Sequence, residues 1–283
     1  MIKPMLAHKF DESRIDWNDQ VFLQPKLDGV RCLFTKYGAF SRTGKRFMNV
    51  EHLEGSLKLF FDAQPYAVLD GELYNHKLKD DFEKIISLVR KQKPTDEDKN
   101  DAQELVQFHV YDYIDSTTKT NKNYKERSYY LSKHLGDHAW MFYGVRLVHT
   151  YVLRHLDHAK FLHKKMLQDG YEGSIIRQNT PYVHKRSFGL MKMKDFSDTE
   201  ATIIDYEPGK GKRKGTLGKF IMLDSEGVKF GCPPGKGYTH DHLKLMLKNV
   251  NDYIGKKATF TYFQRTKAGS YRHPHFKGLR DYE

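Results

Sequence analysis

Apolar residues along the chain follow two alternating patterns. Short runs rich in Val, Ile, Leu, Phe and Tyr predict β-strands, at 20–24, 30–36, 67–74, 106–114, 173–178 and 190–194. Apolar residues at helical spacing predict helices over 80–92 and 152–168, with Gly170 as the C-cap of the second. The polar segment 93–103, KPTDEDKNDAQ, is predicted to be a loop. The first two-thirds of the chain are therefore expected to form a mixed α and β domain.

The pattern changes near residue 195. Beyond it, short strands are separated by Gly-rich turns, and one helix over about 240–252 precedes the strand KATFTYFQ. Short strands, Gly-rich turns and a single helix are typical of a small β-barrel such as an OB-fold. We therefore expect a first domain over residues 1–195 and an OB-fold domain over residues 196–283.

Length and composition agree with two packed domains. The chain has 283 residues, of which 39% are hydrophobic, so a folded protein is expected rather than disorder. It has neither a signal peptide pattern nor an apolar run near the roughly 18 residues that a membrane span needs. Cys32 and Cys232 are far apart and form no C-x-x-C pair. A disulfide framework and a zinc ribbon are therefore not expected, and a reducing cytoplasm is the simplest setting.

The net charge of +12 favours a polyanionic partner such as nucleic acid. The excess is concentrated towards the end of the chain, since residues 197–283 hold 16 Lys and Arg against 10 Asp and Glu. Many soluble proteins are basic for no functional reason, so charge alone carries modest weight. The basic run in this region is either a solvated turn or a contact to backbone phosphates, and we favour phosphate contact. It comprises Lys210, Lys212, Arg213 and Lys214.

The segment FLQPKLDGVRCLF places several chemically useful side chains next to each other. Lys26 is a nucleophile only when its amine is deprotonated. Arg31 suits phosphate or ribose oxygens, and Asp28 could hold a substrate or a metal. Gly29 permits a turn and close approach of the backbone to a ligand. Alone, this short motif is equally consistent with a surface Lys–Asp pair at a strand end.

Other apolar strands each offer a similar side chain near one end. These are Glu72 in VLDGELY, Tyr111 in VYDYI, Glu172 in YEGSIIRQ, and Lys192 and Lys194 in LMKMKDF. Carboxylates can bind Mg²⁺, lysines can neutralise phosphates, and a tyrosine ring can stack on a base. The Gly/Lys-rich run at 209–218 does not match the phosphate-binding pattern G-x-x-x-x-G-K-[ST]. Phosphate binding is therefore expected from side-chain cations.

The order and spacing of these segments resemble the covalent nucleotidyltransferases and, within them, the ATP-dependent DNA ligases. The resemblance covers essentially the whole chain and is carried by KPMLA, KLDGVR, SRTGK, LDGEL, VYDYI, EGSIIR, KRSFGLMKMK and YEPGKGKRKGTLGKF. It implies an α+β fold, in which a nucleotidyltransferase (adenylation) domain of antiparallel sheets with flanking helices is followed by an OB-fold β-barrel.

The resemblance also implies roles for individual residues. Lys26 would form a phosphoamide with AMP, Tyr111 would stack on adenine, and Gln24 is a weaker candidate for an adenine contact. Glu72 would serve the ribose or the metal, and Glu172 would help bind Mg²⁺ or Mn²⁺ with Asp28 or Glu72 nearby. The implied cationic contacts to the nucleotide are Arg31, Arg42, Arg186, Lys192 and Lys194. Arg42 and the basic run at 210–214 are also candidate DNA contacts.

The activity implied is ATP-dependent sealing of nicks in duplex DNA, as used in DNA repair, replication and recombination. It would proceed through lysyl-AMP and a DNA-adenylate, and a monomer in a bacterial or virus-infected cytoplasm is expected. The tail, YRHPHFKGLRDYE, departs from the R-x-D-K ending of the family and resembles small phage-type ligases. Either Lys277 or Arg280 could therefore orient pyrophosphate.

Three alternatives stay open at this point. The nearest is another nucleotidyltransferase, either an RNA ligase or a GTP-using capping enzyme, although PGKGKRKGTLG resembles DNA ligases. A non-catalytic nucleic-acid-binding module is disfavoured because Lys26, Glu72, Glu172, Lys192 and Lys194 are all present. An NAD-dependent ligase is disfavoured because the chain has no cysteine zinc site.

Overall fold

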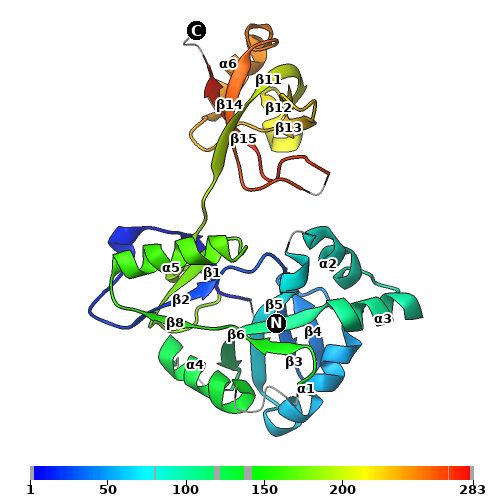
Figure 1. The fold of residues 1–283 in the computed structure, drawn as a ribbon, viewed down its shortest axis with the longest axis vertical. Coiled ribbons are helices and arrows are strands. Elements are labelled where there is room, and N and C mark those ends of the chain that lie inside the picture. The colour runs from blue at the N-terminus through cyan, green and yellow to red at the C-terminus, as the bar shows by residue number, and fades with distance from the viewer. Residues whose placement is uncertain (1–2, 80, 118–121, 137–141, 267, 281–283) are drawn as a thin grey trace. The chain divides into compact units, whose positions relative to one another are not determined.

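A computed structural model describes residues 3–79, 81–117, 122–136, 142–266 and 268–280 (Figure 1). The chain divides into two compact units, Met1–Lys194 and Asp195–Glu283. We call them the N-terminal and C-terminal units and describe each by itself. In the described ranges, every helix is too short or too polar to span a lipid bilayer.

Two five-stranded sheets form the N-terminal unit. The first has the order β1-β10-β9-β2-β8 and the second β4-β3-β5-β6-β7. Pairing is antiparallel except for β1 with β10 and β6 with β7, so the expected antiparallel α+β fold is confirmed. The bounds are β1 Leu6–Lys9, β2 Val21–Pro25, β3 Val30–Thr35, β4 Gly38–Ser41, β5 Ala67–Tyr74, β6 Gln107–Asp115, β7 Val145–Leu147, β8 Tyr151–Leu153, β9 Ser174–Gln178 and β10 Arg186–Met193.

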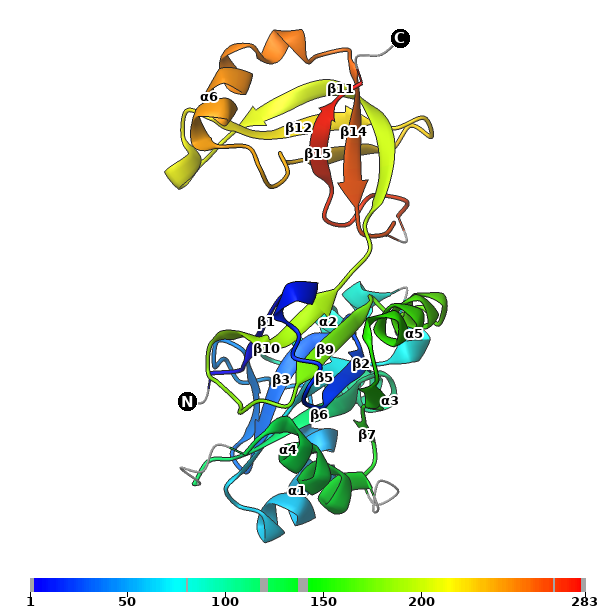
Figure 2. The same ribbon diagram turned by 90° about the vertical axis from the view of Figure 1, so that its left-hand side faces the viewer.

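Helices cover the outer face of each sheet. On the second sheet, α1 (Glu51–Ala63), α2 (Phe82–Val89) and α3 (Asp96–Leu105) pack against a large apolar core. α5 (Leu156–Gln168) lies along the first sheet (Figure 2). Its residues Ala159, Leu162 and Met166 share an apolar core with β2, β9 and β10. The remaining helical segments are α4 Tyr124–Leu131, η1 Glu12–Arg14, η2 His76–Leu78 and η3 Ser132–Gly136. The outer faces are therefore apolar, and polar side chains lie on the inner faces of the two sheets.

All six strands expected in this unit are confirmed, but two other expectations were wrong. The polar segment 93–103 contains most of α3 instead of a loop, because Thr95 and Asp98 form a reciprocal capping box at its start. The helix expected from residue 152 begins at Leu156, because Tyr151–Leu153 pairs with β2 as β8. Gly170 does lie just after this helix, at φ +86°.

The C-terminal unit is one antiparallel sheet of order β13-β12-β11-β14-β15. Its strands curl strongly (Figure 2). They enclose a core that includes Phe220, Phe260 and Phe276, and a bridge from Pro234 to Phe276 joins the two edge regions of the sheet. The expected helix appears as α6, which is shorter than predicted and is followed by the turn η6. The bounds are β11 Ser197–Pro208, β12 Leu217–Leu223, β13 Lys229–Cys232, α6 His240–Lys248, β14 Lys257–Tyr262, β15 His275–Leu279, η5 Gly211–Arg213 and η6 Val250–Asp252.

Candidate active site

Lys26 lies where β2 ends, and its backbone is held by the start of β9. Its N–H donates to the carbonyl of Gly173 at 2.9 Å, and its own carbonyl accepts from the N–H of Glu172 at 3.1 Å. A Cβ on Gly173 would meet the Met193 carbonyl oxygen at 2.2 Å, and its φ is +142°, so this close approach requires glycine. The backbone of the nucleophile candidate is therefore fixed against the segment that leads into β9, which in turn packs closely on the end of β10.

One carboxylate joins two of the predicted lysines. Glu172 is only 7% exposed, and its two oxygens accept separately from Lys26 Nζ and Lys194 Nζ. The structure therefore brings these three predicted residues together. An ammonium group is a donor but not a nucleophile, so attack by Lys26 requires its proton to leave first.

A β-bulge in β6 directs two consecutive side chains to the inner face of the second sheet. Gly71 pairs with Val110 and Asp70 pairs with Asp112, which leaves Tyr111 as the extra residue. Val110, the residue before Tyr111, packs in the apolar core on the helix-covered face of the sheet. A bulge re-aims side chains in this way, and here it places both Tyr111 and Asp112 inside.

Tyr111 stands among charged neighbours. Its hydroxyl donates to Glu72 at 3.3 Å, and the guanidinium groups of Arg31 and Arg177 lie 5.7 Å and 5.2 Å from its ring centroid. Burial raises the pKa of Glu72 from 4.5 to about 7, although the positive charges of Lys26 and Arg31 oppose the rise. This is the second group of predicted residues that the fold brings together.

The raised pKa predicts a pH dependence of stability that Glu72 causes. Folded Glu72 binds a proton between pH 4.5 and about 7 where the unfolded chain does not, so stability falls as the pH rises through this window. The Glu72→Gln variant cannot titrate, so we expect wild type to lose up to about 3 kcal/mol relative to it across the window. Urea unfolding at several pH values measures this difference. Parallel curves for the two proteins would contradict the prediction.

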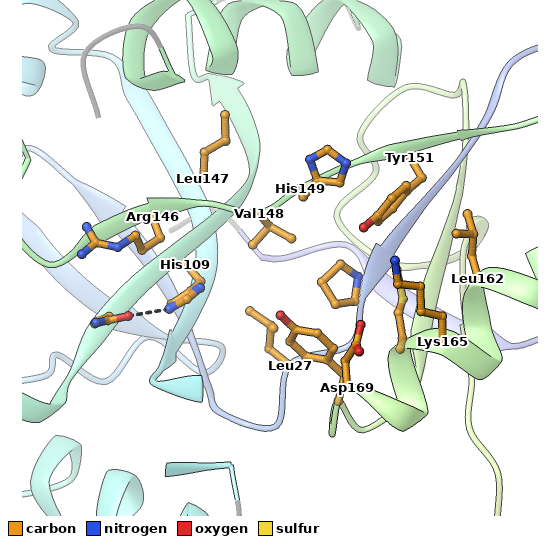
Figure 3. Close-up of a pocket in the computed structure, with 14 residues that line it drawn as sticks. Leu27, His109, Arg146, Leu147, Val148, His149, Tyr151, Leu162, Lys165 and Asp169 are labelled. Atoms are coloured by element: carbon orange, nitrogen blue, oxygen red, sulfur yellow. Dashed lines mark hydrogen bonds between the residues drawn. The ribbon is translucent and has the colours of Figure 1, made fainter. Parts of the chain in front are cut away.

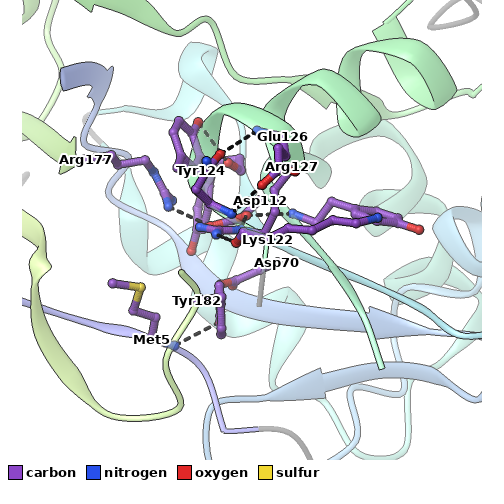
Figure 4. A network of polar contacts seen from close by, with 12 residues as sticks. Met5, Asp70, Asp112, Lys122, Tyr124, Glu126, Arg127, Arg177 and Tyr182 are labelled. Carbon is purple, nitrogen blue, oxygen red and sulfur yellow. Dashed lines mark hydrogen bonds and ion pairs between the residues drawn. The ribbon is translucent and has the colours of Figure 1, made fainter. Parts of the chain in front are cut away.

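Arg31 is held by an acid that sequence reasoning did not single out. Asp70 on β5 accepts from Arg31 Nε at 3.0 Å and from Arg31 Nη2 at 2.6 Å. The Tyr182 hydroxyl donates to Asp70 at 2.7 Å and accepts from the backbone N–H of Met5 at 2.9 Å (Figure 4). The only signal in the sequence was the position of Asp70, two residues before Glu72 in LDGEL.

Gln24 is 2% exposed and joins the buried network of Arg177, Asp112 and Arg127. Its Oε1 accepts from Arg177 Nε at 2.6 Å, and Arg177 Nη1 donates to Asp112 at 2.8 Å. Asp112 also accepts from Arg127 Nε of α4 at 2.8 Å. Sequence reasoning missed Arg127, Asp112 and Arg177, although the last two stand inside VYDYI and EGSIIR. The network ties β2, β6, β9 and α4 together.

The other predicted cations lie in more open positions. Arg42 is exposed in the turn after β4, and Arg186 is exposed at the start of β10, where it donates to the Ala7 carbonyl. Lys192 is half-buried on β10, and Lys194 follows two residues later, so both side chains are on the same face of the chain. Asp28 is half-buried in the loop between β2 and β3.

Predicted residues in the C-terminal unit lie on its surface. The basic run surrounds η5 between β11 and β12, and Lys210, Lys212, Arg213 and Lys214 are all exposed. Lys277 pairs with Asp198 at 2.7 Å, and Arg280 pairs with Glu200. Both pyrophosphate candidates therefore have an acidic partner on β11.

A hollow of about 360 Å³ lies beside the site and was not predicted (Figure 3). Pro25 and Leu27, the neighbours of Lys26, line it together with His109, Arg146 and Lys165. Side chains alternate along an extended segment, so Pro25 and Leu27 point to the opposite face from Lys26. Burial lowers the pKa of His109 to about 4, with the charges of Arg146 and His76 adding to the effect. His109 is therefore uncharged at neutral pH, and the charged side chains that line the hollow are Arg146, Lys165 and Asp169.

The described residues contain no group of three or more His, Cys, Asp or Glu side chains that could hold a metal by themselves. Mg²⁺ commonly keeps several waters and is bound through one or two carboxylates together with substrate phosphates. Glu172, whose two oxygens face the lysines, is a carboxylate ligand of this kind. The residues present therefore fit Mg²⁺ that arrives with a phosphate ligand.

Two family matches cover most of the chain. Residues 4–194 match the ATP dependent DNA ligase domain, and residues 208–280 match the DNA ligase OB-like domain. The DNA ligase of African swine fever virus (strain Badajoz 1971 Vero-adapted) is 29% identical over 236 residues, covering 77% of this chain and 52% of that protein. The DNA ligase of Haemophilus influenzae is 27% identical over 226 residues, covering 79% and 75%. The chain spans about half the length of the viral relative.

Solved structures share the fold. A structure of a Lig E DNA ligase, described as binding DNA with a minimal scaffold, has a TM-score of 0.80 at 23% identity and covers 99% of this chain and 100% of that chain. The ATP-dependent DNA ligase of bacteriophage T7 in complex with ATP has a TM-score of 0.57 at 18% identity, with 98% of each chain covered. The first family match spans more than half of the residues, and so the chain belongs to the ATP-dependent DNA ligase family.

Proposed function

We propose that this chain is an ATP-dependent DNA ligase that seals nicks in duplex DNA. The observation that carries the proposal is the pairing of Lys26 and Lys194 on the two oxygens of buried Glu172. It lies within the region that matches the ligase domain. We assign residues 1–195 as the adenylation domain and residues 196–283 as the OB-fold domain, acting together as a monomer.

Lys26 is the proposed nucleophile. Its Nζ loses a proton and attacks the α-phosphorus of ATP, so that an N–P bond forms and the P–O bond to pyrophosphate breaks. A 5′-phosphate oxygen at the nick then takes the adenylyl group, which breaks the N–P bond. Finally the 3′-hydroxyl loses its proton to water and attacks that activated phosphate, so that a phosphodiester bond forms and the P–O bond to AMP breaks. Each step transfers one phosphoryl centre, so positioning and charge neutralisation are the main tasks of the protein.

The remaining residues of the site orient the nucleotide. Tyr111 offers its ring to adenine and Gln24 its amide, while Glu72 and Arg31 serve the ribose. Lys192 and Lys194 neutralise phosphate charge, as a fixed cation does most effectively where water is excluded. Arg42 and Arg186, both exposed at strand ends, reach phosphate oxygens of the nucleotide or the DNA.

Glu172 would hold Mg²⁺, with Asp28 or Glu72 nearby. When bound, the ion would stabilise negative charge on the phosphate oxygens. The chain's own contribution is that a single carboxylate serves both lysines. If the Glu172 carboxylate moves away from Lys26, the Lys26 ammonium group loses the acceptor of its hydrogen bond. It can then release a proton to water more easily.

The basic run of the C-terminal unit is proposed to contact DNA backbone phosphates. We expect the double variant Lys212→Ala/Arg213→Ala to bind nicked duplex more weakly and to lower the slope of log affinity against log salt by about two. Fluorescence anisotropy at several salt concentrations measures both quantities. The matched control is Lys244→Ala/Lys248→Ala on α6, which removes two exposed lysines from another surface. An equal loss in both variants would contradict a specific role for the run.

The experiment that tests the proposed function uses ATP radiolabelled on its α-phosphate. The protein is incubated with labelled ATP, GTP or NAD⁺ and Mg²⁺, resolved on a denaturing gel, and then chased with nicked duplex DNA. A covalent band with ATP only, lost as sealed strand appears, is the expected result. A band that chases only onto RNA would indicate an RNA ligase, and a band with GTP only a capping enzyme. No band from folded protein would overturn the proposal.

A further inference from the structure

The amide of Gln24 is enclosed by partners that decide which end carries the oxygen. Arg177 Nε, which can only donate, lies 2.6 Å from Oε1. The carbonyl of Tyr111, which can only accept, lies 3.4 Å from Nε2, and the hydroxyls of Tyr124 and Thr150 each lie 2.9 Å from it. A reversed amide would set NH₂ against guanidinium and oxygen against oxygen, so one orientation is strongly favoured.

Arg177 is itself immobilised by buried charges. Its Nη1 lies 2.8 Å from Asp112, and Arg127 contacts the same carboxylate through Nε at 2.8 Å and Nη2 at 3.2 Å (Figure 4). Burial alone would raise the pKa of Asp112, but the two arginines bring it below its usual value. The triad is thus ionised at neutral pH, and a fully bonded buried network specifies a single arrangement of its members.

The fixed orientation leaves one acceptor position on Gln24. An amide oxygen has two lone pairs, and Arg177 uses one of them. Adenine carries an amino group at its 6-position, whereas guanine carries an oxygen there. We propose that Arg177, held by Asp112 and Arg127, determines the choice of adenine over guanine by keeping the Gln24 oxygen in place as an acceptor. This inference rests on the proposed function, in which Gln24 faces the base.

The test compares initial rates of covalent labelling with ATP and with GTP. In the Arg177→Met variant the amide is free to turn, so the ratio of ATP to GTP rates is expected to fall by about ten- to a hundredfold. Arg146→Met is the matched control, because Arg146 is exposed and donates to its neighbour's carbonyl. Its ratio is expected to equal that of wild type. A merely structural role for Arg177 would lower both rates together and leave the ratio unchanged.

Two further variants make the test decisive. Glutamate presents an oxygen in either orientation, so Gln24→Glu added to Arg177→Met should restore the preference for ATP. Arg177→Lys keeps a cation for Asp112 but lacks the Nε–H that donates to Gln24, so it should lower the ratio even if Arg177→Met does not fold. An unchanged ratio in every folded variant, while wild type labels with ATP, would overturn the inference and leave the proposed function intact. Failure of wild type to label would instead overturn the proposed function.

Discussion

The Lys26→Ala variant is expected to form no covalent enzyme–AMP, a loss on the order of a thousandfold or more in labelling rate. Removal of the amine eliminates the proposed nucleophile, so we expect no N–P bond to form. Lys194 also contacts Glu172, but it donates to the opposite carboxylate oxygen, so we do not expect it to replace Lys26. Labelling with α-phosphate-labelled ATP and gel electrophoresis measures the result.

The structure also predicts that this variant folds. Glu172 keeps Lys194 as its partner, so no carboxylate is left buried without a cation. Lys58→Ala is the matched control, because Lys58 is exposed on α1 and pairs with Asp62, which is also exposed. The control should label like wild type. Adenylyl label recovered from a folded Lys26→Ala protein would refute the choice of nucleophile.

The second large effect is expected from Glu172→Gln. The amide has the same shape but no charge, so the two lysines lose their shared counter-ion and the site loses its best carboxylate for Mg²⁺. Two effects oppose each other, since loss of the ion pair also makes it easier for Lys26 to lose its proton. We expect positioning and charge on the phosphates to matter more, with labelling slowed by about a hundredfold or more.

Titration with Mg²⁺ separates these two effects. If Glu172 binds the ion, Glu172→Gln needs a higher Mg²⁺ concentration for half-maximal labelling as well as being slower. Glu54→Gln is the matched control, because Glu54 on α1 pairs with Arg46 at 3.1 Å in the same unit. A Glu172→Gln protein that labels at the wild-type rate, with the wild-type Mg²⁺ requirement, would rule out this role.

Elements with long apolar runs were predictable, and short or polar elements were not. The buried strands β5 and β6 run for eight and nine residues, long enough for their apolar pattern to stand out. By contrast, β7 and β8 have three residues each, too few to show any alternation. α3 is almost entirely polar, so only its capping pair, Thr95 and Asp98, marked it as a helix.

The residues of the candidate site also fall into those that the sequence predicts and those that it does not. Lys26, Glu72, Tyr111 and Glu172 stood out because each lies within or directly beside an apolar run, where a polar or aromatic side chain of this kind calls for a chemical reason. Asp70 and Asp112 stand in comparable places but were passed over, because a buried acid acquires meaning only when its arginine is known. Their arginines, Arg31 and Arg177, lie on other strands and are 39 and 65 residues away in the chain.

The sequence by itself determined the two-part organisation, the main strands and the side chains able to carry nucleotide chemistry, because local apolar periodicity and residue type are properties of short segments. Only the tertiary structure decided that Lys26 and Lys194 share Glu172, that a bulge turns Tyr111 and Asp112 to one face, and that Arg177 fixes the Gln24 amide. These contacts join distant strands, and their geometry depends on strand register and burial, which no single segment specifies.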